Sequence, residues 1–147
     1  MFTAANPGCA EENLFNLHKL RFEENFQETL EDFIGSGPAE YPCSYQQLSV
    51  YLKDQLIAVS FMALGRKSCS SIYAAFAPEF SRRRLGIYTL LSELEFARVH
   101  DMKFHYIGYA TMEPSCYDYK KQFAAVEYFD WEGQWLSGEG FSELDEC

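Results

Sequence analysis

The sequence predicts an α/β (α+β) fold, a mixed and mostly antiparallel sheet with helices packed on both faces. Three β-rich runs follow one another with only short polar links between them. Apolar residues at helical spacing lie both before and after these runs, and a fourth β-rich run follows the second helical stretch. Because a helix intervenes, the fourth strand is expected to lie parallel to the third through a right-handed crossover.

The first elements are predicted to be an irregular lead-in and a long helix. Residues 1–10 contain Asn-Pro-Gly and carry no periodic pattern. Over residues 11–34, apolar side chains form one broad stripe and acidic side chains occupy the opposite side, which predicts a single amphipathic helix. Two glycines and a proline in residues 35–38 are expected to end it.

The sheet is predicted from the middle of the chain. Lys53-Asp54 and residues 65–67 provide polar turns between β-rich runs, so the first three strands are expected to form an antiparallel meander. The predicted elements are strands at 45–52, 55–64 and 70–77, a helix from Leu85 to about His100, a strand at 103–109, a short helix at 116–123 and a last strand at 126–131. The acidic tail, 133–147, is expected to be loose.

The composition fits one domain, residues 11–132, since 147 residues at 48% hydrophobic fill one core. No apolar run approaches the roughly 20 residues that span a bilayer, and the N-terminus lacks the pattern of a secretory signal. We therefore expect a cytoplasmic protein with no membrane partner. The five cysteines lack zinc-site spacing, so no metal is expected.

The net charge of −10 is unevenly distributed. Residues 1–40 carry two basic and eight acidic side chains, and residues 126–147 carry seven acidic and no basic ones. The middle, 41–125, carries ten basic and seven acidic side chains. The acidic total argues against DNA as a partner, while the mildly basic middle leaves room for a local anion site.

The most informative stretch is the basic turn between the third predicted strand and the second helix. Arg82, Arg83 and Arg84 stand there, directly before Leu85 and Gly86. The amides and the positive dipole end of a helix N-terminus favour an anion, so this turn is a candidate phosphate site. The alternative is a solvated charged turn with an ordinary glycine near a helix end.

The predicted layout resembles the GNAT (acyl-CoA N-acyltransferase) fold. In that fold two parallel strands splay apart, and the donor phosphates bind the turn before the central helix. Residues 83–88, Arg-Arg-Leu-Gly-Ile-Tyr, are similar to the Arg/Gln-x-x-Gly-x-Gly/Ala loop of that fold, with Tyr88 in place of the last small residue.

A more specific resemblance rests on six short motifs that occur in a fixed order. They are Leu-Ile-Ala-Val-Ser at 56–60, Ser-Ser-Ile-Tyr at 70–73, Pro-Glu-Phe at 78–80, Leu-Gly-Ile-Tyr at 85–88, Tyr-Ile-Gly-Tyr at 106–109 and Tyr-Lys at 119–120. In this order and at similar spacing they resemble the C-terminal domain of the N-degron aminoacyl-tRNA-protein transferases, the arginyltransferases and bacterial leucyltransferases.

This resemblance implies transfer of an aminoacyl group from a charged tRNA to the α-amine of a protein or peptide N-terminus. An aminoacyl ester is already activated, so positioning, proton removal and oxyanion stabilisation suffice. No bound cofactor is expected, with aminoacyl-tRNA as the donor. Two alternatives stay open: an acyl-CoA-dependent N-acyltransferase using acetyl-CoA, and a non-catalytic module that binds a protein N-terminus.

The candidate site residues fall into three sets. The donor-binding set contains the residues of the basic turn: Arg82, Arg83, Arg84, Leu85, Gly86 and Tyr88. The catalytic set contains possible proton acceptors and hydrogen-bond donors: His105, Tyr109, Glu113 and Tyr119. The substrate-binding set offers stacking rings and a cation: Tyr73, Tyr106 and Lys120. Taken singly, the tyrosines also fit core or rim positions and His105 fits a packed histidine.

Overall fold

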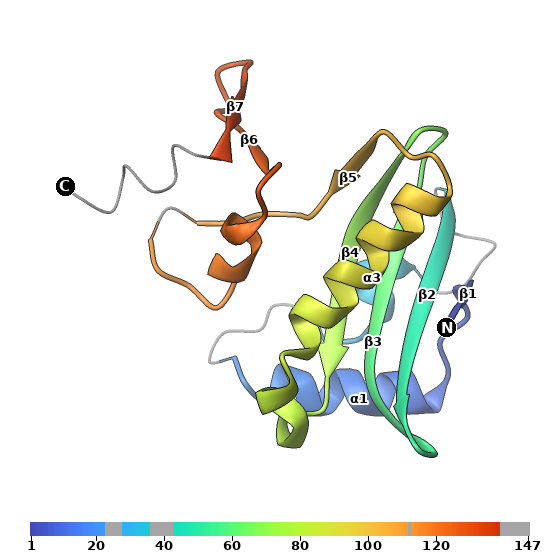
Figure 1. Ribbon diagram of the computed structural model, residues 1–147. Coiled ribbons are helices and arrows are strands. Elements are labelled where there is room, and N and C mark those ends of the chain that lie inside the picture. Colours follow the sequence, from blue (N-terminus) through green and yellow to red (C-terminus); the bar gives the residue numbers. More distant parts are fainter. Residues whose placement is uncertain (23–27, 36–42, 112, 139–147) are drawn as a thin grey trace. The chain divides into compact units, whose positions relative to one another are not determined.

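The computed structural model describes residues 1–22, 28–35, 43–111 and 113–138. The chain divides into two compact units, Met1–Gly108 and Tyr109–Cys147, and each is described by itself. The first unit contains a five-stranded sheet of order β1-β2-β3-β4-β5 (Figure 1). Three of its four neighbouring strand pairs are antiparallel, the fourth is parallel, and helices accompany the sheet, so the predicted α/β class is confirmed. Assignment to the GNAT fold stays a prediction.

The centre of the sheet is the predicted meander. β2 (Ser44–Leu52), β3 (Gln55–Leu64) and β4 (Ser68–Phe76) pair antiparallel in chain order, within one or two residues of the predicted strands. Lys53, with φ 54°, makes the predicted tight turn between the first two. The pairing of β3 with β4 shifts between Phe61 and Met62, which marks a bulge in the middle of the sheet.

The crossover after β4 also follows the prediction. A 3-10 helix, η1 (Pro78–Arg83), leads into α3 (Leu85–Val99), and β5 (Phe104–Tyr106) then pairs parallel with the first residues of β4. The predicted strand over 103–109 is correct in place and direction but only three of its residues are in the sheet.

One edge strand was not predicted. β1 (Phe2–Ala4) pairs antiparallel with β2 inside the stretch that we expected to be an irregular lead-in. The Met1 ammonium donates to Ser49 O at 3.0 Å, and Ala5 N donates to Tyr45 O at 3.0 Å, so both ends of this short strand are held. Three residues are too few to show a strand periodicity, so no pattern in the sequence indicated this strand.

The prediction of one helix over 11–34 is wrong. α1 (Cys9–Lys19) ends in a turn at residues 20–22, and the next described helix is the single turn α2 (Glu31–Ile34); residues 23–27 lie outside the described part. A straight helix would separate Phe15 and Phe33 by about 27 Å. Their ring centroids lie 6.0 Å apart, because both rings pack on the same face of the sheet. The predicted helix end at Gly35 is confirmed, with φ 84°.

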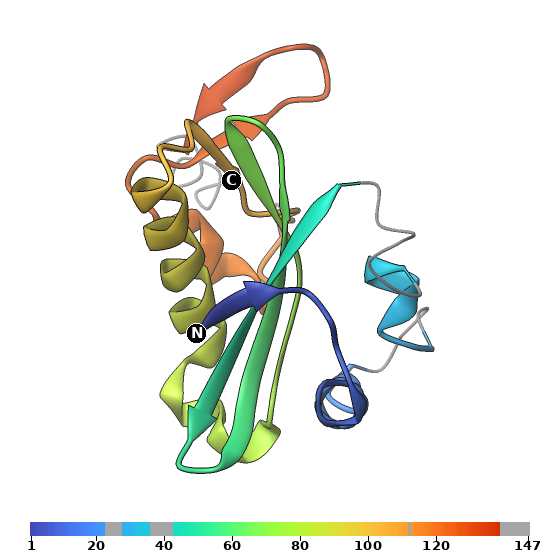
Figure 2. The same ribbon diagram turned by 90° about the vertical axis from the view of Figure 1, so that its right-hand side faces the viewer.

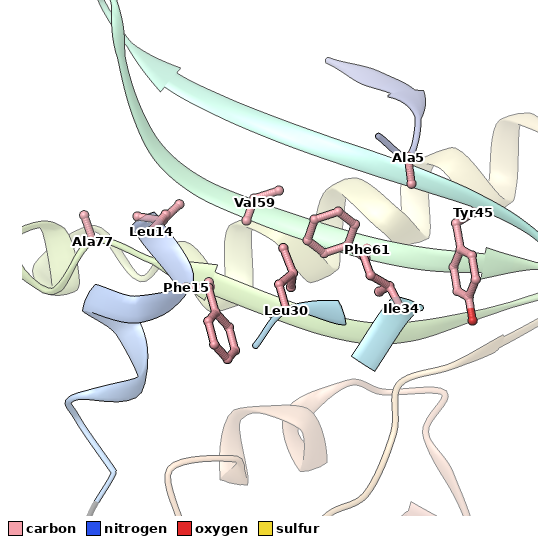
Figure 3. Packing of buried hydrophobic residues seen from close by; sticks show 10 residues of the cluster. Ala5, Leu14, Phe15, Leu30, Ile34, Tyr45, Val59, Phe61 and Ala77 are labelled. Carbon is pink, nitrogen blue, oxygen red and sulfur yellow. The ribbon is translucent and has the colours of Figure 1, made fainter. Parts of the chain in front are cut away.

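Helices cover both faces of the sheet, as predicted. α3 lies on one face and α1 with α2 on the other (Figure 2). The larger hydrophobic cluster lies under α1 and α2 (Figure 3), and its buried members are Ala5, Leu14, Phe15, Leu30, Ile34, Tyr45, Val59, Phe61, Ala75 and Ala77. Two smaller clusters lie towards α3, one around Leu85 and one around Met62, Cys69 and Ala97.

His18 is an ionisable group inside the α1 side of the core. It is 5% exposed, its ring packs against Phe76 at 4.7 Å between centroids, and its Nδ1 accepts from Phe76 N at 3.3 Å. Burial, with the nearby Arg21 charge as a smaller cause, lowers the pKa of His18 from 6.5 to about 4, although the Phe76 backbone contact opposes the shift. The ring is therefore neutral at neutral pH.

The low pKa of His18 predicts acid sensitivity. Between pH 6.5 and 4 the unfolded chain binds a proton that the folded chain does not, so stability is complete above pH 6.5 and falls with pH. The loss at pH 5 is expected to be about 2 kcal/mol from this residue. Urea unfolding at pH 7 and pH 5 measures it, and His18→Gln should lose less between these two pH values. Equal losses in both proteins would contradict the assignment.

The second unit contains a short helix and a hairpin. The 3-10 helix η2 (Asp118–Gln122) confirms the predicted short helix, and β6 (Glu127–Phe129) confirms the last predicted strand. β6 pairs with β7 (Trp135–Ser137) in a separate two-stranded sheet. Gly133, with φ 113°, lies in the connecting turn. The prediction of a loose tail is thus wrong for 135–137, while 139–147 lie outside the described residues.

Within the described residues, no helix combines the length and the apolar character that crossing a bilayer requires. The four described cysteines, Cys9, Cys43, Cys69 and Cys116, are free thiols.

Candidate functional site

The basic turn is exposed and directly precedes α3. Arg82, Arg83 and Arg84 are all exposed. Arg84 adopts left-handed backbone angles, φ 54° and ψ 44°, and its carbonyl accepts the amides of Ile87 and Tyr88 at 3.0 and 3.1 Å. The chain therefore reverses at Arg84 and opens a 15-residue helix at once. The free amides of the first helical turn and three guanidinium groups lie in the same short segment.

The remaining members of the predicted donor set have different surroundings. Leu85 is 4% exposed and packs in a core cluster with Ile57 and Ala58, so it anchors the helix start. Gly86 is half-buried, and its carbonyl accepts from Thr89 Oγ1 at 3.1 Å. Tyr88 is 52% exposed. The turn thus offers its arginines, Gly86 and Tyr88 at the surface, while Leu85 holds it in place.

A buried polar cluster joins α3 to the two parallel strands. Ser71 Oγ of β4 donates to Glu93 Oε2 of α3 and lies 3.0 Å from His105 Nε2 of β5. His105 Nε2 is also 3.3 Å from Glu93 Oε2, and the two side chains are 4% and 3% exposed. His105 Nδ1 is buried and has no hydrogen-bond partner among the described residues. The structure thus places His105, a predicted catalytic residue, against a carboxylate.

This polar cluster lies where β4 and β5 part. The two strands pair only from Ser68 to Ser70 of β4, and Ser71 is the next residue along. Ligands in α/β sheets commonly bind beyond the carboxyl ends of adjacent parallel strands. The cluster therefore occupies a position that the topology itself marks as a candidate site.

The two tyrosines of the predicted substrate-binding set differ in exposure. Tyr73 is half-buried on the α1 side, with its ring centroid 4.2 Å from that of Phe33 and 5.5 Å from that of Phe15. It belongs to the core packing that we weighed as the alternative. Tyr106, paired in register with Ser70, is 45% exposed and stays a candidate for contact with a substrate.

In the second unit the structure brings Lys120 and Tyr109 together. Lys120 Nζ donates to Tyr109 O at 3.1 Å and lies 5.1 Å from the ring centroid of Tyr117. Tyr109 is 80% exposed and its ring stacks on Trp131 at 6.3 Å. Glu113 is exposed and Tyr119 is half-buried.

Asp118, the first residue of η2, is another carboxylate in this unit that could accept a proton. Lys121 Nζ lies 2.9 Å from its Oδ1, and Ser115 N donates to Oδ2 at 2.9 Å. The hydrogen bond from Lys121, followed by that from Ser115, lowers the pKa of Asp118. A carboxylate with a lowered pKa is a weaker base, which favours the other candidates.

Sequence reasoning missed Glu93 and Ser71. Glu93, a charged residue of the predicted second helix, is 2% exposed and faces the sheet. The available signal was its spacing, because Leu85, Thr89, Glu93 and Ala97 follow at four-residue intervals and all are buried. No comparable signal marked Ser71, since serines are common in this strand.

These features define an α/β domain with a basic turn at a helix start and a buried carboxylate–imidazole cluster between that helix and two parallel strands. Residues 12–130 match the family model described as arginine-tRNA-protein transferase, C terminus. The chain therefore belongs to this family, which confirms the resemblance drawn from the six ordered motifs.

Relatives with known names agree with this family. The chain is 33% identical over 105 residues to an aspartate/glutamate leucyltransferase of Acinetobacter baylyi, covering 67% of this chain and 38% of the relative. It is 31% identical over 88 residues to that of Acinetobacter baumannii, covering 60% and 32%, and 26% identical over 110 residues to that of Campylobacter jejuni, covering 75% and 43%. The chain thus spans well under half the length of these relatives.

Proposed function

We propose that this chain moves an aminoacyl group from a charged tRNA to the α-amine of a protein N-terminus, as in the N-degron pathway. The observation that carries this proposal is membership of the transferase family across residues 12–130, which include the basic turn and the polar cluster. The names of the relatives suggest leucine as the donated residue and N-terminal aspartate or glutamate as the acceptor. Charged tRNA as the donor would place the reaction in the cytoplasm.

The basic turn is proposed to bind the donor. Three exposed arginines and the first amides of α3 suit phosphate oxygens, which are the groups that tRNA presents in greatest number. Tyr88 is exposed one turn into the helix, and we propose that its ring contacts a sugar or base of the donor. We propose Arg82, Arg83, Arg84, Gly86 and Tyr88 as the donor-binding residues.

The chemistry after binding requires few groups. The amine attacks the ester carbonyl, a base removes the amine proton, and hydrogen-bond donors stabilise the oxyanion. His105 is proposed as the base. Side chains with hydroxyl or cationic groups are proposed to orient the two substrates, and these are Tyr106, Tyr109, Tyr119 and Lys120. No step requires a bound cofactor.

A transfer assay tests this function. The chain is incubated with tRNA charged with labelled leucine or arginine and with peptides that begin with Asp, Glu or Gly. We expect label on peptides with a free acidic N-terminus and none on the same peptides with an acetylated N-terminus, because only a free α-amine can attack. A parallel reaction with acetyl-CoA tests the alternative. Acetylation of the peptide without aminoacyl transfer would replace the proposal by N-acyltransferase activity, and failure of both reactions would contradict it.

A further inference from the structure

We propose that Glu93 and Ser71 together hold His105 in the tautomer that leaves Nδ1 free to accept the proton of the attacking amine. This inference rests on the proposed function and deepens it. It makes Nδ1 the reacting atom and assigns positioning roles to Ser71 and Glu93, neither of which was a candidate from sequence.

The hydrogen bonds of Ser71 determine which nitrogen of His105 carries the hydrogen. The Ser71 hydroxyl donates its only proton to Glu93 Oε2, so Ser71 Oγ can only accept from its other neighbour. That neighbour is His105 Nε2, 3.0 Å away, which must therefore carry a hydrogen. In a neutral imidazole the second nitrogen then has a lone pair. Nδ1 is thus a proton acceptor, and it is the atom without a partner among the described residues.

The unpartnered nitrogen itself indicates a ligand. A buried hydrogen-bonding atom left without a partner destabilises the structure that contains it. Among the described side chains only Ser60 Oγ shares this condition, and Ser60 lies within β3. Nδ1 differs because His105 is the penultimate residue of β5, beside the point where the parallel strands part. A donor such as an amine would satisfy it there.

The charges around the ring favour protonation during reaction. Glu93 of α3 is the charged group that contacts the ring, and its buried carboxylate would balance an imidazolium. From β4 the ring faces Ser71 and, in register, Cys69. Burial, with Glu93 as the smaller cause, raises the pKa of Cys69 to about 11, so that thiol stays neutral.

Access to Nδ1 requires a local movement. The atom is covered in the free structure, yet β5 is held to β4 through only three residue pairs. Gly108, with φ 79°, follows two residues after the end of the strand and gives the backbone a site of rotation. We propose that residues 107–108 move when the acceptor binds.

The proposed step balances. The amine nitrogen bonds to the ester carbonyl carbon and gives a tetrahedral oxyanion. A proton passes from that nitrogen to His105 Nδ1, and the imidazolium is stabilised by Glu93. The bond from the carbonyl carbon to the ribose oxygen then breaks, the carbonyl reforms as an amide, and the proton passes from Nδ1 to the leaving oxygen. His105 returns to its starting state, and no other reactant is needed.

Single-turnover transfer as a function of pH tests the inference, using leucyl-tRNA and a peptide that begins with Asp. The variants are His105→Gln, Glu93→Gln, and Ser60→Ala as the matched control, a second buried group without a partner. His105→Gln is expected to lose about 100-fold or more in rate. Glu93→Gln keeps an acceptor for Ser71 but removes the charge, so it should lose about tenfold and move the acid limb of the profile to lower pH. Ser60→Ala should leave the rate within about twofold.

Three results would overturn the inference while the proposed function stands: a His105→Gln rate near wild type, an acid limb that Glu93→Gln does not move, or an equal loss in Ser60→Ala. An unreactive wild-type chain would instead remove the proposed function. ¹⁵N NMR of the His105 imidazole distinguishes a positioning role of Glu93 and Ser71 from a purely structural one without measuring activity. We expect the Nε2-protonated tautomer in wild type. The opposite tautomer contradicts the proposal.

Discussion

Phe15→Ala is expected to lower the free energy of unfolding by about 4 kcal/mol, the largest stability effect we predict. Phe15 has no exposed surface, and its ring lies between α1, Phe33 and Tyr73 of β4, with centroid distances of 6.0 and 5.5 Å. Removing the ring leaves a cavity bounded by three separate elements, which cannot all close on it. Urea unfolding at pH 7.5 measures the loss.

The matched control is Leu17→Ala, two residues along the same helix. Leu17 is 51% exposed, so its replacement should cost no more than about 0.5 kcal/mol. Similar losses in the two variants would show that Phe15 does not join α1 to the sheet.

The packing of Phe15 near Phe33 also shows why the prediction of a single helix over residues 11–34 failed. The apolar stripe over residues 11–34 is real, since Phe15, Leu30 and Ile34 are all buried. Periodicity shows which residues face the core, but it does not show whether these residues belong to one continuous helix or to two separate segments. Asp32 Oδ2 accepts the amides of Glu28 and Thr29, which starts a new turn at that point. Such local capping competes with a continuing helix and is weakly marked in sequence.

The strands of the meander and the helix after the basic turn were predictable because each has a clear period and a marked end. β3 is a ten-residue strand of mostly apolar residues, and α3 follows a charged turn directly. β1 and β7, at three residues each, are defined by the strands that they pair with. Their formation depends on partners far away in sequence, which single-sequence patterns do not encode.

The candidate site also has one part that could be predicted from sequence and one part that could not. The exposed basic turn could be found from composition and order alone. The cluster of Ser71, Glu93 and His105 could not, because three elements bring it together and each residue has an ordinary sequence context. Only Glu93, set among buried helix positions at four-residue spacing, carried a hint.

The second large effect is expected from the basic turn. Changing Arg82, Arg83 and Arg84 together to Gln should lower the transfer rate at limiting tRNA at least tenfold, because phosphate contacts supply much of the affinity. Gln keeps part of each side-chain stem and removes the charge. All three residues are exposed, so the urea midpoint should change little. Single-turnover rates with subsaturating leucyl-tRNA measure the effect.

The chain offers a matched control for this charge change. Arg66 and Lys67 are exposed in the turn between β3 and β4, at the opposite end of β4 from the basic turn. Changing both to Gln alters the net charge by nearly as much but leaves the start of α3 intact. Their variant should transfer at close to the wild-type rate. A loss equal to that of the triple variant would mean that general charge, and not the basic turn, attracts the donor.

The central claim is that the turn opening α3 binds the phosphates of the donor. The most direct measurement is the affinity for leucyl-tRNA at several salt concentrations, for wild type and both charge variants. Each phosphate contact contributes about −0.7 to −0.9 to the slope of log K against log salt. We predict a slope shallower by about two to three in the Arg82/Arg83/Arg84 variant and unchanged in the Arg66/Lys67 variant. An unchanged slope in the triple variant would contradict the account.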